Sequence, residues 1–307
     1  MIFTWNYQEN EPKTIKKFVK EVGLSKGLLA KVKFQGGRIA VNGKEENVLY
    51  SLKKGDLLEV TIPDEEEHET LLQDNQPLEI IYEDEHFLVV NKPIQVASIP
   101  AQFHPNGTMA NRVKHYIMEK NYPNKVVHIV TRLDRDTSGL MLFAKHGFAH
   151  ALLDQQLRNK QVLKKYVALV GGNHDQLASH EMITLPIERD TTSILKRQIG
   201  EQGLSAQTEY WLKTSYPMCS LVDIRLHTGR THQIRVHFEG IGCPLLGDEL
   251  YHGNMDLGIK RQALHCEKLS FTHPFTKEML TLTAPLPQDM IKVIDEQTEL
   301  KRRNENE

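Results

Sequence analysis

The stretch His128–Lys145, HIVTRLDRDTSGLMLFAK, decides how the rest of the chain is interpreted. It turns apolar from Gly139 to Ala144, and just before that it gathers two arginines and two aspartates within five positions: Arg132, Asp134, Arg135 and Asp136. This pattern predicts a charged loop that leads into a β-strand at the edge of a sheet. Nearby cations would keep Asp134 ionised at neutral pH. A functional site and a salt-bridged surface turn fit these residues equally well.

Length and composition limit the classes of protein to consider. A chain of 307 residues is long for one domain, so we expect two, at least one with a sizeable core. The net charge of −2 argues against a basic coat for nucleic acid over the whole surface. No apolar run is long enough to cross a membrane, and the first residues lack the pattern of a secretory signal. Three scattered cysteines without CxxC pairs predict reduced thiols in a cytoplasmic protein: Cys219, Cys243 and Cys266.

Charge is distributed unevenly along the first ninety residues. Between Lys13 and Ile62 there are eleven Lys and Arg but five Asp and Glu, whereas residues 63–90 contain ten acidic residues and no Lys or Arg. Such a reversal indicates a boundary between two parts of the chain. We therefore expect a basic module at residues 1–62, followed at 63–76 by a solvated acidic linker that contains PDEEEHET.

Short helices and turns organise the basic module. Apolar residues at helical spacing predict a helix that ends at Gly23, and Ser25 suits the N-cap of a second helix. Asn-Gly and Gly-Asp turns then separate two or three short strands. The run GLSKGLLAKVKFQGGRIAVNGK, continued by LKKGDLLEV, resembles the S-four-like RNA-binding module of ribosomal proteins and RNA-modifying enzymes. An ordinary solvated lysine-rich face is the alternative, but the resemblance implies phosphate contacts from four residues: Lys26, Lys31, Lys33 and Arg38.

Residues 77–295 mix strand-like and helix-like segments without regular βαβ alternation. Strands are predicted in LEIIYEDEHFLVVNKP, GLMLFAK, KKYVALVGG and CSLVDIRL, and helices at about Met109–Lys120, around Phe148–Leu157 and within HTGRTHQIRVHFEGIG. This mixture predicts an α+β fold with a mixed, largely antiparallel sheet. The last residues, 296–307, end in KRRNENE and are expected to form a frayed polar tail.

Several separated motifs of this region occur together in one known family. In chain order they are Lys92-Pro93, TRLDRDTSG, Tyr166 within KKYVALV, LHTGRTHQIRVH and ALHC. Together they resemble the RluA-type pseudouridine synthases, over roughly Leu78 to Met290. The resemblance implies an enzyme that needs no cofactor. Its reaction detaches the uracil of a uridine in RNA at N1, turns it, and reattaches it through C5.

The resemblance also implies roles for single residues. Asp134 matches the catalytic aspartate, a nucleophile or base toward the sugar or ring. Arg235, in QIR, matches the arginine that pairs with this carboxylate. Tyr166 matches the tyrosine that stacks on the base and is a candidate to take the C5 proton. Arg132 matches the arginine that fills the gap left by the flipped-out nucleotide.

Two positions depart from the family pattern, and neither is one of these four. Thr131 stands where the family usually has histidine, and IQVASIP follows Pro93 in place of a loop with glycine and histidine. A metal site is not expected, since His227, His232 and His237 are spaced by five and share neither a helix face nor a strand face.

The sequence therefore predicts a monomeric RNA pseudouridine synthase that acts on structured RNA, ribosomal RNA first and tRNA second. The alternative is a non-catalytic RNA-binding or ribosome-assembly protein that has kept the fold. The presence of Asp134, Tyr166 and Arg235 together favours the enzyme. An unrelated Asp-dependent hydrolase would need a second catalytic carboxylate, for which Asp136 is the one close candidate.

Overall fold

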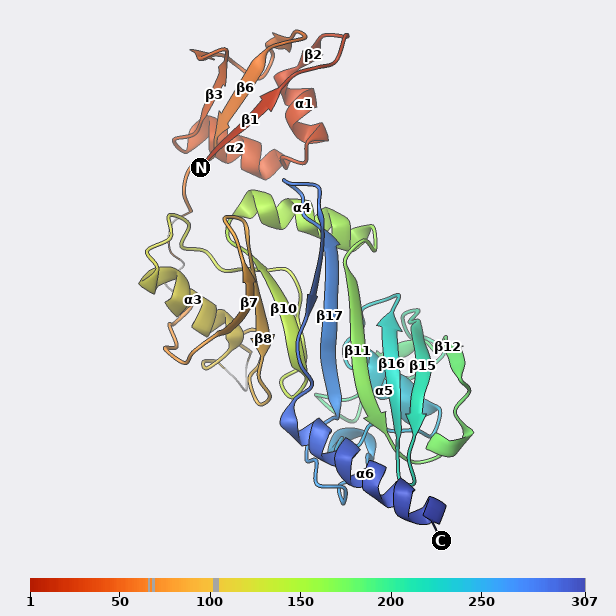
Figure 1. Ribbon diagram of the computed structural model, residues 1–307. Coiled ribbons are helices and arrows are strands. Elements are labelled where there is room, and N and C mark those ends of the chain that lie inside the picture. Colours follow the sequence, from red (N-terminus) through yellow and green to blue (C-terminus); the bar gives the residue numbers. More distant parts are fainter. Residues whose placement is uncertain (66, 68–69, 102–104, 307) are drawn as a thin grey trace.

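The computed structural model describes residues 1–65, 67, 70–101 and 105–306. A small N-terminal module packs at one end of a larger domain that is built on a ten-stranded sheet (Figure 1). Within the described residues, no helix is long and apolar enough to cross a membrane.

The N-terminal module is a four-stranded antiparallel sheet against which two short helices pack. The strand order is β1-β6-β3-β4, and a separate short pair joins β2 to β5. The Thr14 and Ser25 side chains cap the two helices, as the sequence predicted for Ser25. The first strand was not predicted; its Phe3 and Trp5 side chains are partly buried and pack against the core of the module. The elements are β1 (Ile2–Asn6), β2 (Lys13–Thr14), α1 (Ile15–Glu21), α2 (Lys26–Phe34), β3 (Arg38–Val41), β4 (Lys44–Glu45), β5 (Ser51–Leu52) and β6 (Leu57–Thr61).

The larger domain confirms the predicted α+β fold with a mixed, largely antiparallel sheet. Its main strand order is β12-β15-β16-β11-β17-β10-β8-β7, with β18 beside β17 and β9 beside β10. Only the β10–β17 pair is parallel among the pairs of this sheet. The strands are β7 (Glu79–Glu83), β8 (Phe87–Lys92), β9 (His128–Ile129), β10 (Ser138–Ala144), β11 (Leu163–Val170), β12 (His180–Ile183), β15 (Thr208–Ser215), β16 (Ser220–Leu226), β17 (Leu264–Thr272) and β18 (Met279–Thr283). A separate hairpin pairs β13 (Ile187–Arg189) with β14 (Arg197–Ile199).

Four α-helices surround this sheet, and two of them lie at its opposite ends. Helix α4 lies under the N-terminal module, and α6 crosses the far end (Figure 1). The helices are α3 (Met109–Glu119), α4 (Gly147–Arg158), α5 (Gln233–Gly240) and α6 (Gln288–Asn306), with single turns η1 (His174–Gln176) and η2 (Glu249–Tyr251).

The expected polar tail at 296–307 instead continues helix α6 as far as Asn306. Gln297 is buried within it and accepts a hydrogen bond from the Met218 amide at 3.0 Å. This helix was not predicted, because KRRNENE is strongly polar. A helix can nevertheless form there, since only one of its faces needs to contact the domain.

The parallel approach of β10 to β17 depends on Gly139. Its φ is +111°, and a Cβ there would lie 2.3 Å from the Cys266 carbonyl oxygen. A larger residue would therefore force the two strands apart. The charged loop 131–137 precedes this point directly, so the close pairing fixes where that loop ends.

The N-terminal module contacts the larger domain through an aromatic interface and one carboxylate. Phe148 of α4 is buried in the core of the module, and Phe3 meets it edge-on at 4.9 Å. Glu65, in the segment expected to be a solvated linker, is largely buried. It accepts hydrogen bonds from the His128 ring at 2.6 Å and the Gly147 amide at 3.0 Å. Glu65 thus helps to hold the two parts together.

Candidate active site

The backbone of the loop 131–137 is held from several directions. Ser98 Oγ donates to the Leu133 carbonyl at 2.6 Å and accepts from the Leu133 amide at 3.0 Å. At the start of the loop, Thr131 Oγ1 accepts the Leu142 amide of β10 at 3.0 Å. The residue that replaces the family's histidine therefore joins the loop to the sheet.

Two buried cations hold the next part of the loop. Lys92 Nζ donates to the Arg135 carbonyl at 2.7 Å and to two carbonyls of its own segment. Burial lowers the pKa of Lys92 to about 7, while these three acceptors match the three hydrogens of its ammonium form. Arg261 donates to the Asp136 carbonyl at 3.2 Å and forms a bidentate pair with Asp289 of α6. The loop backbone is thereby fixed, whereas the Asp134 side chain remains directed outward.

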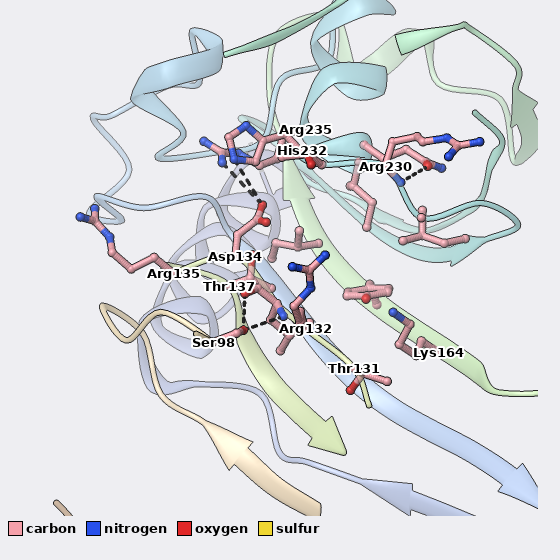
Figure 2. A pocket seen from close by; sticks show the side chains of 18 of the residues that line it. Ser98, Thr131, Arg132, Asp134, Arg135, Thr137, Lys164, Arg230, His232 and Arg235 are labelled. Atoms are coloured by element: carbon pink, nitrogen blue, oxygen red, sulfur yellow. Dashed lines mark hydrogen bonds and ion pairs between the residues drawn. The ribbon is translucent and has the colours of Figure 1, made fainter. Parts of the chain in front are cut away.

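Asp134 faces two basic side chains from the segment at the start of α5. Its Oδ2 lies 3.6 Å from Arg235 Nη1 and 4.0 Å from His232 Nε2, and Figure 2 shows both groups directed at the carboxylate. The Asp134 side chain is 32% exposed, so it reaches the pocket. Burial lowers the pKa of His232, so among the described residues Arg235 is the charged partner of Asp134. The carboxylate thus has charge compensation and open space on one side.

Arg235 is itself held by a second carboxylate, which the sequence analysis did not single out. Asp248 accepts from Arg235 Nε at 2.7 Å and Nη2 at 2.8 Å, and both side chains are buried. Burial would lower the pKa of Arg235, but the hydrogen bonds with Asp248 outweigh this and raise it. The Tyr251 ring lies 4.8 Å from the guanidinium, and its hydroxyl is 3.0 Å from His232 Nδ1. Asp248 therefore orients Arg235 toward Asp134.

Tyr166 is buried in the wall of the same pocket, on β11. Burial, Cys266 and Asp134 raise the pKa of its hydroxyl well above 10. Lys164 Nζ lies 5.8 Å from the centre of the ring, and burial lowers the pKa of that lysine. The phenol is therefore protonated at neutral pH. Its ring offers an aromatic surface on which a base can stack.

One cavity of about 420 Å³ brings together the four predicted residues of this domain: Arg132, Asp134, Tyr166 and Arg235. Arg132 is exposed at its rim. Arg135 and Asp136 pair with each other at 2.7 Å, so the Asp136 carboxylate binds its neighbour in the chain. The structure thus shows one carboxylate directed at the other groups of the pocket.

The three histidines of the α5 region have separate partners. His227 contacts Glu209 at 2.8 Å, His237 contacts the Leu185 carbonyl at 2.8 Å, and His232 contacts Tyr251. The described residues contain no group of three or more side chains placed to hold a metal ion.

The four basic residues predicted in the N-terminal module fall into two groups. Lys26 and Lys31 line a hollow that faces α4, and Lys31 lies 3.3 Å from Glu65. Lys33 lies over the Phe34 ring, and Arg38 donates to the Gly43 carbonyl. These last two do not line that hollow.

Comparison with known proteins identifies the family. The model of the RNA pseudouridylate synthase family matches residues 86–240. An uncharacterised RNA pseudouridine synthase, YjbO of Bacillus subtilis (strain 168), is 47% identical over 92% of this chain and 98% of its own length. This chain belongs to the RluA-type RNA pseudouridine synthases. It is therefore an enzyme of that class.

Other relatives of the synthase have more specific names. Ribosomal large subunit pseudouridine synthase D of Xylella fastidiosa (strain Temecula1 / ATCC 700964) is 36% identical over 71% of this chain and 69% of its own. Among solved structures, the human RNA pseudouridylate synthase domain containing 4 aligns with a TM-score of 0.59 at 23% identity. That alignment covers 72% of this chain and 93% of the human one, and it supports the fold.

Sequence reasoning missed several residues that build the synthase site. Lys92 was noted for its motif without a role, and Ser98, Asp248 and Arg261 were not considered. An acidic residue directly after an apolar run, as in PLLGD, was the one available signal for Asp248. The partners of these side chains are distant in sequence, so no local pattern reveals them.

Proposed function

We propose that this synthase converts specific uridines in structured RNA, with ribosomal RNA the first candidate, to pseudouridine without a cofactor. The relatives named for the large ribosomal subunit support the choice of RNA. The main structural support for this function is the Asp134 carboxylate, which is partly exposed in a cavity and lies opposite Arg235. We propose that the synthase acts as a monomer in the cytoplasm, a location in keeping with its three free, buried cysteines.

Asp134 supplies the carboxylate that attacks the sugar or ring or removes a proton. Arg235 keeps it ionised and in place, because a guanidinium nearby favours the charged form. Arg235 is rigid because Asp248 binds its other edge. The site therefore provides a preorganised anion without any metal.

Tyr166 forms a flat wall of the cavity on which the flipped uracil stacks. Its place in the cavity wall supports this role, and its hydroxyl stays the candidate to take the C5 proton. Arg132, exposed at the rim, enters the space that the flipped nucleotide leaves. Such contacts offset an extrusion cost of a few kcal/mol.

The N-terminal module binds RNA outside the pocket, in keeping with its S-four-like sequence. Its exposed lysines supply affinity that depends on salt and not on base sequence. Lys26 and Lys31 face the catalytic domain, so they are better placed for an RNA that also enters the pocket than Lys33 and Arg38.

Pseudouridine mapping in total RNA from cells with and without this protein tests the proposal. We expect at least one site in ribosomal RNA to disappear with the gene and to return with the wild-type protein. Complementation by Asp134→Asn should fail. Asp136→Asn is the matched control from the same loop, since its carboxylate pairs with Arg135. Unchanged pseudouridine at every site would instead favour the non-catalytic RNA-binding alternative.

A further inference from the structure

Three hollows follow one another from the active-site cavity to the N-terminal module, and each shares lining residues with the next. The second hollow lies where α4 ends and β11 begins, and it shares Lys164, Gly229 and Arg230 with the active-site cavity. The third lies between the module and α4 and shares Arg158 with the second. Figure 1 shows α4 between the module and the sheet, with its end next to the start of β11. We call the second and third hollows together the basic groove.

The lining of the basic groove is far more positive than the chain as a whole, whose net charge is −2. It contains eight cationic and two acidic side chains. Both carboxylates already have partners, since Glu65 binds His128 and Asp154 pairs with Arg158. The cations are Lys20, Lys26, Lys31, Arg158, Lys160, Lys164, Arg225 and Arg230.

Several of these cations have no charged partner inside the protein. Among the residues that the structure describes, Lys26, Lys160 and Arg225 form no ion pair, although all three are exposed. A row of uncompensated cations within a concave surface attracts a flexible polyanion. A lone ion or a small ligand would need a more enclosed site.

The lining also indicates which part of an RNA it would contact. Neither of its two hollows contains Phe, Tyr or Trp, and its rings are those of His128, His150 and His227, of which His128 and His227 are bound to Glu65 and Glu209. Contacts of cations with phosphates position a nucleic acid without reading its sequence. The aromatic wall at Tyr166 lies in the active-site cavity, so base recognition belongs there.

We propose that the RNA strand next to the target uridine lies in the basic groove, with its phosphates against Arg225, Lys160 and Lys26. The active-site cavity and the N-terminal module then bind one continuous RNA. This inference rests on the proposed function, because it takes the uridine in the cavity as its starting point.

The test compares two double variants that each remove two positive charges. Lys160→Gln/Arg225→Gln changes the groove, and Lys292→Gln/Arg302→Gln changes exposed residues of α6 at the other end of the molecule. The probe is oligouridine of about 20 nucleotides, longer than one binding site, beside one of about four. Affinity is measured over a range of KCl concentrations with the full chain.

For the long probe, the groove variant should lower the slope of log affinity against log salt by about 1.4, or about 0.7 for each lost phosphate contact to a single strand. The α6 variant should leave this slope unchanged, and the short probe should bind the wild type and both variants alike. Thermal unfolding should show all three proteins folded. Equal slopes for the groove variant and the wild type, or no binding of the long probe by the wild type, would overturn the proposal.

Activity separates this inference from the proposed function. On RNA that contains a mapped target site, the groove variant should raise KM and leave kcat unchanged. The proposed function alone would be refuted if the wild type forms no pseudouridine although the salt slopes of the wild type and the groove variant differ as expected. An active enzyme whose slopes do not differ would refute the groove alone.

Discussion

The loop 131–137 is held firmly by hydrogen bonds to its backbone, whereas the N-terminal module carries charged side chains that are exposed. In the loop, four successive carbonyls, from Leu133 to Asp136, accept hydrogen bonds from Ser98, Thr137, Lys92 and Arg261. In the module, Lys26 is exposed on a short helix and has no ion pair within the described residues.

The difference reflects two physical demands. Chemistry at one atom of a base needs a carboxylate that stays within a few tenths of an ångström of its working position. Binding to phosphates needs many cations close together, and each cation can move without much loss of affinity. Substitutions around the loop should therefore change the rate of pseudouridine formation. Substitutions in the module should change the affinity for RNA or the attachment of the module to the catalytic domain.

The largest effect is expected from Asp134→Asn. The amide is close in size but cannot serve as anion or base, so activity should fall by at least about 10³-fold. RNA affinity should change little, because Asp134 is one carboxylate in a strongly cationic surface. Single-turnover pseudouridine formation and a binding titration on the same RNA measure the two separately. Substantial residual turnover would show that another group performs the chemistry.

Asp248→Asn should produce the next largest effect. The amide leaves Arg235 with a single neutral acceptor, so the guanidinium loses its fixed direction toward Asp134. A displacement of about 1 Å can reduce kcat by about 10²-fold. KM should stay close to the wild-type value, since Asp248 is buried and does not contact RNA. A rise in KM with normal kcat would contradict this positioning role.

Lys92→Met tests whether the loop depends on its buried lysine. The folded pKa of about 7 lies below the ordinary 10.5, so between these values the unfolded chain binds a proton that the folded chain lacks. Lys92 therefore makes stability rise with pH across this window, by up to about 1.4 kcal/mol per pH unit.

Urea unfolding at pH 7 to pH 10 should show this rise in the wild type and a smaller one in Lys92→Met. Because the Arg135 carbonyl loses its donor, the variant should also have a lower kcat. Parallel stability curves for the two proteins would indicate that Lys92 does not titrate in this range.

Glu65→Gln should have the smallest effect and should spare kcat. Burial would raise the pKa of Glu65, but hydrogen bonds with His128 and the Gly147 amide lower it to about 2. Its stabilising contribution is therefore complete above about pH 4.5 and is lost as the pH falls toward 2. We expect a loss of about 1–2 kcal/mol near neutral pH.

Limited proteolysis near residue 65 would report looser attachment of the module. Asp64→Asn is the matched control, because that carboxylate is exposed and pairs only with the N-terminus in the described part of the chain. Equal protection of both variants would remove Glu65 from the interface.

The sequence alone determined the family, the fold class and the residues expected at the site. Asp134, Tyr166, Arg235 and Arg132 lie in motifs with many specified positions, so they could be assigned before their distances were known. The cap at Ser25 and the strand at Gly139–Ala144 likewise follow from local preferences, because turns, caps and apolar runs depend on neighbours in the chain.

Only the tertiary structure decided what holds those residues in place. Asp248 orients Arg235, Lys92 and Arg261 fix the loop, and Glu65 joins the module to the catalytic domain. Each of these effects depends on burial and on contacts between distant segments. A buried charge is costly unless fixed partners bind it, so its position is well defined. Neither burial nor the basic groove follows from residue spacing, because both arise when separate elements pack against one another.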